Sequence, residues 1–277
     1  MSSQLSLKIK KSQIYLHFIP HILCLIIQGY NCPFIENHLK EKLIMCTSFI
    51  KKTEDNFYVA MNFDNDGMKY SINTKKKDWF IVYVDTGKVK APSFGIHKSG
   101  VFFNSLCAPS NGKGEYRRGA GVIHTTRLLL DIIDGKIQMN QFNDYLSQRE
   151  IVNVPGLSTH NMICDEQGYV WIIEPGRGNK YFPLAENEFQ ILTNDSIIDS
   201  IESKTKIQCS RYTTVEKLLS EPIAFNEDRA FKILEEVKQS HGEWITDFSM
   251  VYDKSKEAVY YCKNQIFNDI QQYDFNC

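Results

Sequence analysis

The alternation of apolar and polar residues predicts a β-rich protein from residue 46 onward. The segments CTSFI (46–50) and NFYVAMNFD (56–64) are rich in β-branched and aromatic residues, and the polar stretch between them is typical of a turn. DWFIVYV (78–84) is an almost continuous apolar run, as found in strands that are buried on both faces. SGVFFNSLC (99–107) predicts a further strand, entered through Gly100.

Helical spacing of apolar residues follows. Residues 122–134 and 138–149 each place large apolar side chains on one face, and Gly135 ends the first of these helices. Residues 158–176 predict a hairpin with DEQG as its turn, and residues 189–194 predict a strand that ends at Asn194.

The last part of the chain repeats the mixture of helices and strands. Residues 213–220 and 226–239 are helical by pattern, and residues 245–253 and 258–264 predict a closing hairpin. The order of elements favours an α+β fold in which helices cover antiparallel sheets. No internal repeat or linker interrupts residues 46–277, so we expect them to form a single domain.

Composition narrows the class of protein. The chain has 277 residues, 43% hydrophobic and 23% charged, which is ordinary for a soluble globular protein. Its net charge of −1 gives no electrostatic basis for nucleic acid or an anionic membrane as the main partner. The eight cysteines form no C-x-x-C pair and no zinc-finger spacing, so we expect reduced thiols, a cytoplasmic location, and neither a metal nor an organic cofactor. Phosphate-loop, G-x-S-x-G, dinucleotide and H-E-x-x-H motifs are absent.

Residues 1–45 differ from the rest. A basic start precedes IYLHFIPHILCLII, an apolar run that is too short and too interrupted for a membrane span. Three accounts stay open: a removable propeptide, a poor export signal, or upstream sequence wrongly joined to a chain that starts at Met45. The third is the simplest, because Met45 stands directly before Cys46 and an initiator methionine is normally removed before a small residue.

Cys46 has unusual chemistry if it is the first residue of the working protein. A free α-amine titrates near pH 8, so it is a usable base at neutral pH, whereas an amide nitrogen takes no proton. A terminal cysteine therefore carries a nucleophile and a general base on one residue. The other interpretation of Cys46 is a small apolar residue in a strand.

His160 and Asn161, in STHNM, could be mistaken for parts of a Cys-His-Asn site. Residues of one triad are seldom neighbours in sequence, so we expect His160 to be a hydrogen-bonded strand residue near the rim of a pocket.

Five segments resemble the choloylglycine hydrolases, the linear-amide hydrolases that include bile salt hydrolases and penicillin V acylases. MCTSF…FYVAMNFD is similar to the opening of that family, and HNMICDEQGYVWIIE is similar to its central hairpin. LTND resembles its T-N segment, CSRY its S-R-aromatic segment, and DFSMVYDKSKEAVYYCKNQIFNDIQQYDF its closing hairpin and tail. These matches cover residues 46–277 in order. The resemblance implies the four-layer αββα sandwich of N-terminal-nucleophile hydrolases.

The resemblance also implies roles for particular residues. Cys46 would be the nucleophile, and its own amine would accept the thiol proton and deliver it to the leaving amine. Asp64 would hold that amine, Asn194 would donate to the oxyanion, and Arg211 would lie close to the nucleophile. For the second oxyanion donor the candidate is Asn104, in FFNS, followed by Asn111.

The chain departs from the family at one position that matters. Met61 stands where the family has an arginine beside the nucleophile, and a methionine cannot supply that positive charge. The chain from Cys46 onward is also shorter than typical bile salt hydrolases. Both departures weaken an inference to bile salts more than an inference to amide hydrolysis.

The expected function is hydrolysis of a linear, non-peptide C–N amide through a thioester on Cys46, with residues 1–45 removed. The substrate is expected to be a small-molecule amide with an apolar acyl group, and the resemblance implies a homotetramer. Alternatives are an acyltransferase of the same fold, a catalytically inactive relative that only binds ligands, and an exported thiol protein held by disulfides.

Overall fold

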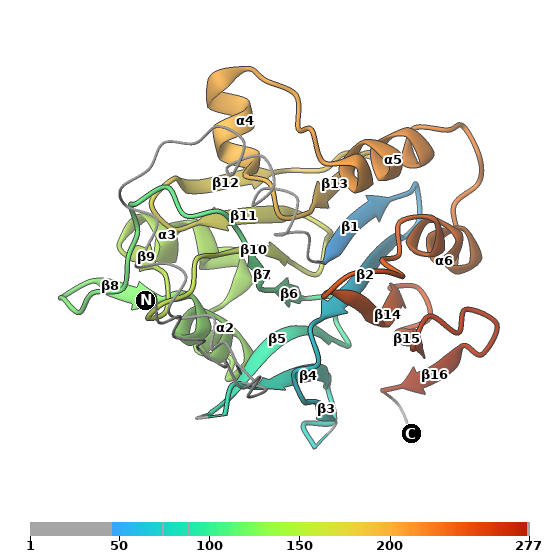
Figure 1. Cartoon of the computed structure of the whole chain (residues 1–277), viewed down its shortest axis with the longest axis horizontal. Coiled ribbons are helices and arrows are strands. Elements are labelled where there is room, and N and C mark those ends of the chain that lie inside the picture. Colours follow the sequence, from blue (N-terminus) through green and yellow to red (C-terminus); the bar gives the residue numbers. More distant parts are fainter. Residues whose placement is uncertain (1–45, 74, 88, 276–277) are drawn as a thin grey trace, which may run out of the picture. The chain divides into compact units, whose positions relative to one another are not determined.

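The computed structural model describes residues 46–73, 75–87 and 89–275. The predicted leader, residues 1–45, lies outside the described residues. Within them the protein is a mixture of helices and antiparallel sheets, which confirms the expected α+β class (Figure 1). Every pairing within the two large sheets is antiparallel.

The first sheet has six strands, and the predicted nucleophile lies directly before one of its inner strands. The order is β13 (Phe189–Leu192), β1 (Thr47–Lys52), β2 (Phe57–Asn65), β14 (Ile245–Asp253), β15 (Ala258–Lys263) and β16 (Gln271–Asp274). A shift of register between Thr246 and Phe248 bends β14 where it runs beside the end of β2. The predicted strands at 46–50, 56–64, 189–194, 245–253 and 258–264 are all present, although β13 ends at Leu192.

The second sheet has eight strands. The main path is β12 (Gly178–Phe182), β11 (Val170–Glu174), β10 (Thr159–Cys164), β6 (Phe102–Asn104), β5 (Lys90–His97), β4 (Trp79–Asp85) and β3 (Tyr70–Asn73), and β7 (Leu106–Cys107) also pairs with β10. The single strand predicted at 99–107 is therefore divided at Ser105. A small parallel pair joins β8 (Val122–His124) to β9 (Glu150–Val152).

The helices follow the predicted apolar patterns with shifted ends. They are α2 (Thr125–Ile133), the 3-10 turn η1 (Met139–Gln141), α3 (Phe142–Ser147), α4 (Ile197–Ser203), α5 (Ser210–Leu219) and α6 (Glu227–Glu236). The helix predicted from residue 122 begins at Thr125 because the His124 side chain accepts the N–H of Arg127 as an N-cap. The short helix α4 was not predicted.

Three clusters of buried apolar side chains organise these elements. The largest cluster combines residues of both sheets, such as Phe63 and Phe248 from the first with Phe94 and Met162 from the second. A second cluster packs α2 and α3 against the eight-stranded sheet, and a third packs α5 and α6 against the six-stranded sheet. In Figure 1, α5 and α6 lie beside β1 and β2. Among the described residues, no helix is long and apolar enough to cross a membrane.

Candidate active site

Cys46 lies immediately before β1, an inner strand of the six-stranded sheet between β13 and β2. Alternation along β1 sends Cys46 and Ile50 into the cluster shared by both sheets, and Phe49 toward the helices. The Cys46 side chain is buried, and its Sγ accepts a hydrogen bond from the Asp64 backbone N–H at 3.4 Å. The backbone nitrogen of Cys46 donates to Asp64 Oδ2 at 2.8 Å. One residue thus holds both the thiol and the nitrogen.

Asp64 is a buried carboxylate, 2% exposed, at the end of β2. Its Oδ2 accepts from the Cys46 nitrogen and from Gln239 Nε2 at 2.6 Å, and its Oδ1 accepts from Thr246 Oγ1 at 2.6 Å. Arg211 Nη1 lies 3.5 Å from Oδ2. Burial raises the pKa of Asp64, while the charge of Arg211 and these hydrogen bonds act in the opposite direction.

Arg211 connects Asp64 to the other predicted site residues. It lies in the first turn of α5, and its side chain is buried. Its Nη1 donates to the carbonyl oxygen of Cys46 and to Thr47 Oγ1, the latter at 2.8 Å, and its Nη2 donates to Asn194 Oδ1 at 3.0 Å. A guanidinium only donates, so this contact fixes which end of the Asn194 amide carries the oxygen.

Asn194 lies two residues beyond the end of β13, and its amide nitrogen donates to the carbonyl oxygen of Cys107 at 2.7 Å. The side chain is therefore held at its oxygen by Arg211 and at its nitrogen by the end of β7. The structure thus brings together Cys46, Asp64, Arg211 and Asn194.

Asn104 lies apart from this group, on the second sheet. Its Nδ2 donates to Ser48 Oγ at 2.7 Å, and its Oδ1 accepts from the Met162 N–H at 2.8 Å. It is fully buried and links β6 to β1 at Ser48, two residues after Cys46. Its role as an oxyanion donor stays a prediction. The second candidate, Asn111, lies on an exposed loop and donates to the carbonyl oxygen of Gly176 at 3.2 Å.

Met61 is fully buried in the cluster shared by the two sheets, opposite Ser48 in the ladder between β1 and β2. An arginine side chain at this position would enter the same apolar cluster. The positive charge in hydrogen-bonding contact with Cys46 comes instead from Arg211, on the helix-covered side of the sheet.

The thiol of Cys46 does not ionise readily in this environment. Burial raises its pKa far above the ordinary value and the charge of Asp64 adds to this, while the hydrogen bond from the Asp64 backbone and the charge of Arg211 act in the opposite direction. The neighbouring thiol of Cys107 has a pKa raised to about 11, again mainly by burial. The Cys46 thiol is therefore protonated at neutral pH, and a nucleophilic role for Cys46 would need a base within reach.

Sequence reasoning missed several members of this site. Thr246 and Gln239 hold the Asp64 carboxylate, Thr47 accepts from Arg211, and the Cys107 carbonyl orients Asn194. Each is an ordinary residue type far along the chain from its partner or buried in a strand, so no local pattern distinguishes it. Among the described residues, no group of three or more His, Cys, Asp or Glu side chains is placed to hold a metal ion.

Comparison with protein-family models finds no match, and no curated relative matches in sequence. Solved structures do match. A cysteine-to-alanine mutant of conjugated bile acid hydrolase from Clostridium perfringens is 16% identical, with a TM-score of 0.64 over 84% of this chain and 93% of that chain. An arginine-to-leucine variant of the same hydrolase is 16% identical, with a TM-score of 0.62 over 83% of this chain and 93% of that chain. Penicillin V acylase from Agrobacterium tumefaciens is 13% identical, with a TM-score of 0.59 over 83% of this chain and 86% of that chain. The predicted resemblance is thus confirmed at the level of the fold: the chain is built like conjugated bile acid hydrolase and penicillin V acylase.

Proposed function

We propose that the protein is an N-terminal-nucleophile hydrolase of the choloylglycine hydrolase family, with the four-layer αββα arrangement, that cleaves linear C–N amides through a thioester on Cys46. The single observation that carries this proposal is the geometry around Cys46. Asp64 binds its nitrogen, and Arg211 binds its carbonyl oxygen and also orients Asn194. An ordinary buried strand cysteine needs none of these contacts.

The proposed first step joins Cys46 Sγ to the amide carbonyl carbon. The thiol proton passes to the α-amine of Cys46, and the carbonyl oxygen becomes an oxyanion. Because burial keeps the thiol protonated, a base must accept its proton as the S–C bond forms, and the proposal assigns this role to the amine of the same residue. Asp64 stabilises the ammonium that results, by a charge-assisted hydrogen bond.

The proposed second step breaks the C–N bond. The ammonium of Cys46 returns its proton to the leaving nitrogen, and the oxyanion collapses to a thioester. Asn194 Nδ2 donates to the oxyanion, a contact typically worth about 3 kcal/mol of barrier. Water, activated by the amine, then hydrolyses the thioester and regenerates the thiol.

The proposal needs a free amine at Cys46, so it includes removal of residues 1–45, which leaves 46–277 as one hydrolase domain. The substrate is a small-molecule amide with an apolar acyl group, because the buried side chains that share a cluster with Cys46 are aliphatic and aromatic. An acyltransferase would use the same thioester with an amine in place of water.

A second candidate is a relative that binds ligands without turnover, favoured by Met61 in place of an arginine. Intact-mass analysis of the protein expressed from the full sequence separates the two. A mature first residue at Cys46, with acyl-amide turnover that Cys46→Ala abolishes, supports the hydrolase. A chain that keeps Met1, or a Cys46→Ala protein with full turnover, contradicts it. Adding amines and analysing products distinguishes hydrolysis from acyl transfer.

A further inference from the structure

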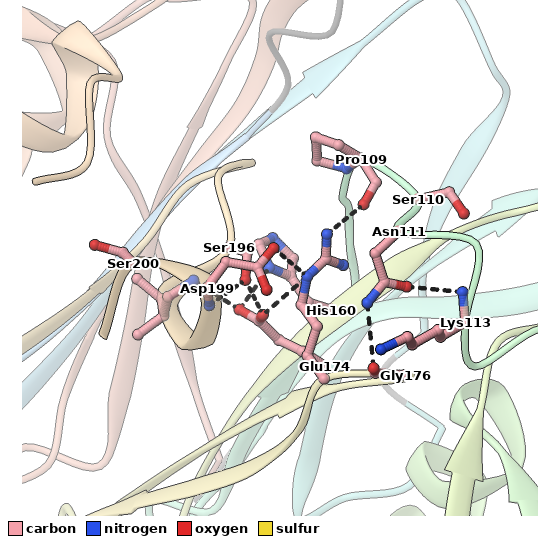
Figure 2. Close-up of polar contacts among 12 residues, drawn as sticks. Pro109, Ser110, Asn111, Lys113, His160, Glu174, Gly176, Ser196, Asp199 and Ser200 are labelled. Atoms are coloured by element: carbon pink, nitrogen blue, oxygen red, sulfur yellow. Dashed lines mark hydrogen bonds and ion pairs between the residues drawn. The ribbon is translucent and has the colours of Figure 1, made fainter. Parts of the chain in front are cut away.

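A buried carboxylate next to the candidate site takes no part in the proposed chemistry. Glu174, at the end of β11, is 1% exposed. Its Oε1 accepts from the Ile197 N–H at 2.8 Å and lies 3.4 Å from His160 Nδ1, and its Oε2 accepts from Ser196 Oγ (Figure 2). A carboxylate only accepts when ionised, so His160 donates through Nδ1. Burial acts to raise the pKa of Glu174, but its contacts with His160, Ser196 and Ile197 outweigh burial and hold it below the ordinary value.

Ser196 and Ile197 form the start of α4. Ser196 is the N-cap of that helix, and its Oγ accepts the N–H of Asp199 at 2.9 Å while it donates to Glu174. Asn194 lies two residues earlier in the chain. Glu174 therefore fixes the backbone just after the predicted oxyanion donor.

Arg177 extends the same network three residues beyond Glu174. Its Nε donates to Asp199 Oδ2 at 2.6 Å, and its Nη2 donates to the carbonyl oxygen of Pro109 at 3.0 Å (Figure 2). Its side chain is only 7% exposed. Pro109 lies two residues after Cys107, whose carbonyl accepts from Asn194. Arg177 thus holds the segment that carries the other end of that hydrogen bond.

Asn194 and Cys107 are 87 positions apart in the chain, and they meet at a hydrogen bond of 2.7 Å. Two residues further along, each segment is hydrogen-bonded to the same turn at the end of β11. Glu174 accepts from Ser196 and Ile197, and Arg177 donates to the carbonyl oxygen of Pro109. A shift of either segment would turn the Asn194 amide away from the direction that Arg211 and the Cys107 carbonyl define. Displacements of about 1 Å at such a donor are enough to lower a rate 100-fold.

We propose that Glu174 and Arg177 form a clamp that positions Asn194 for catalysis by holding both segments that flank its hydrogen bond to Cys107. The two residues are positioning residues, and the clamp rests on the proposed function. A purely structural role would affect only the stability of the fold. The clamp instead affects kcat, through the orientation of Asn194, and does not change the reactivity of the Cys46 thiol.

The test compares Glu174→Gln and Arg177→Lys with Asp165→Asn in protein expressed from the full sequence. Glutamine keeps the shape of Glu174 but removes its charge, and lysine keeps the charge of Arg177 but cannot reach Asp199 and Pro109 together. Asp165 is the matched control, because it is a buried carboxylate at the opposite end of the same hairpin, where it accepts from the N–H groups of Gln167 and Tyr169 at 2.9 Å each. The readouts are kcat and KM for an acyl amide, the rate of Cys46 alkylation by iodoacetamide, and hydrogen exchange at Ile197.

The clamp predicts that Glu174→Gln and Arg177→Lys each lower kcat at least about 10-fold, change KM less than about 3-fold and leave Cys46 alkylation within about 2-fold of wild type. Exchange at Ile197 becomes faster in Glu174→Gln and stays near wild type in Arg177→Lys, because Glu174 accepts that N–H. If one of the two variants fails to fold, the kcat of the other variant tests the clamp. A wild-type protein without turnover overturns the proposed function and the clamp together. An active wild type whose clamp variants keep the kcat of Asp165→Asn overturns the clamp alone.

Discussion

Thr246→Val tests whether the position and pKa of the Asp64 carboxylate depend on its hydrogen bond from Thr246, a residue outside every predicted motif. Thr246 is fully buried in β14, donates to Asp64 Oδ1 at 2.6 Å and accepts the Gln239 N–H at 2.8 Å. Valine has nearly the same shape but no hydroxyl, so the change removes both hydrogen bonds without leaving a cavity.

The expected loss of stability follows from these two bonds. A hydrogen bond to a charged group contributes about 1.5–3 kcal/mol, and a donor left without a partner costs about 1–3 kcal/mol. Gln239 is only half-buried, so we take the lower end of the range for its unpaired N–H. We therefore expect Thr246→Val to lower the free energy of unfolding by about 2–4 kcal/mol. Thr246→Ser keeps the hydroxyl and loses one methyl group, so it should cost only about 1 kcal/mol.

Equilibrium unfolding in urea measures both values, and a pH profile of kcat/KM adds a functional readout. The Thr246 hydrogen bond lowers the pKa of Asp64, so its loss should raise that pKa and move the acidic limb of the profile to higher pH in the valine variant only. Equal stabilities for the valine and serine variants would refute this account of how Asp64 is held.

Three further predictions concern other residues. Asn194→Ala should lower kcat by about 100- to 1000-fold with little change in KM, as steady-state kinetics will show, and an unchanged kcat would remove Asn194 from the oxyanion site. Met61→Arg should lower the free energy of unfolding by at least about 2 kcal/mol, because it places a charge in the apolar cluster between the sheets, whereas Met61→Leu should cost less than about 1.5 kcal/mol in the same urea titration. The folded-state pKa of Glu174 lies below its ordinary value, so its contribution to stability is complete above about pH 4.5 and is lost as the pH falls through the folded pKa. The difference in stability between wild type and Glu174→Gln should therefore shrink below pH 4.5, and a difference independent of pH would contradict the assignment.

The strands could be predicted from the sequence because they are long and apolar on one or both faces. NFYVAMNFD alternates between the inter-sheet cluster and the helix-covered face, and the observed strand β2 covers nearly the same residues. The short helix α4 escaped prediction because two buried isoleucines and an N-cap serine give too little periodicity. The strand predicted at 99–107 is divided because two asparagine side chains take the place of backbone hydrogen bonds between the strands. Asn161 Nδ2 donates to the Asn104 carbonyl at 2.7 Å, and Asn104 Oδ1 accepts the Met162 N–H at 2.8 Å.

The site was predictable only in part. Cys46, Asp64, Asn194 and Arg211 were predicted because each stands in a segment that resembles a family motif, and the structure brings all four together, while their roles stay predictions. Their supports, Gln239, Thr246 and the Cys107 carbonyl, depend on which strands become neighbours. That information is in the topology of the sheets and not in any local stretch of sequence. Thr246 reaches Asp64 only because β14 pairs with β2, and the Cys107 carbonyl reaches Asn194 only because β7 of the second sheet lies close to the segment after β13.

The bond between the Cys46 nitrogen and Asp64 has a consequence for maturation. Asp64 already accepts this N–H in the uncut chain, with Gln239 and Thr246 in place around it. Releasing the leader would exchange an amide donor for an ammonium at the same spot, with no strand to re-pair and no side chain to recruit. In the proposed precursor the contacts around Asp64 would thus already be in place, so activity should appear with the kinetics of peptide-bond cleavage alone, without a refolding lag.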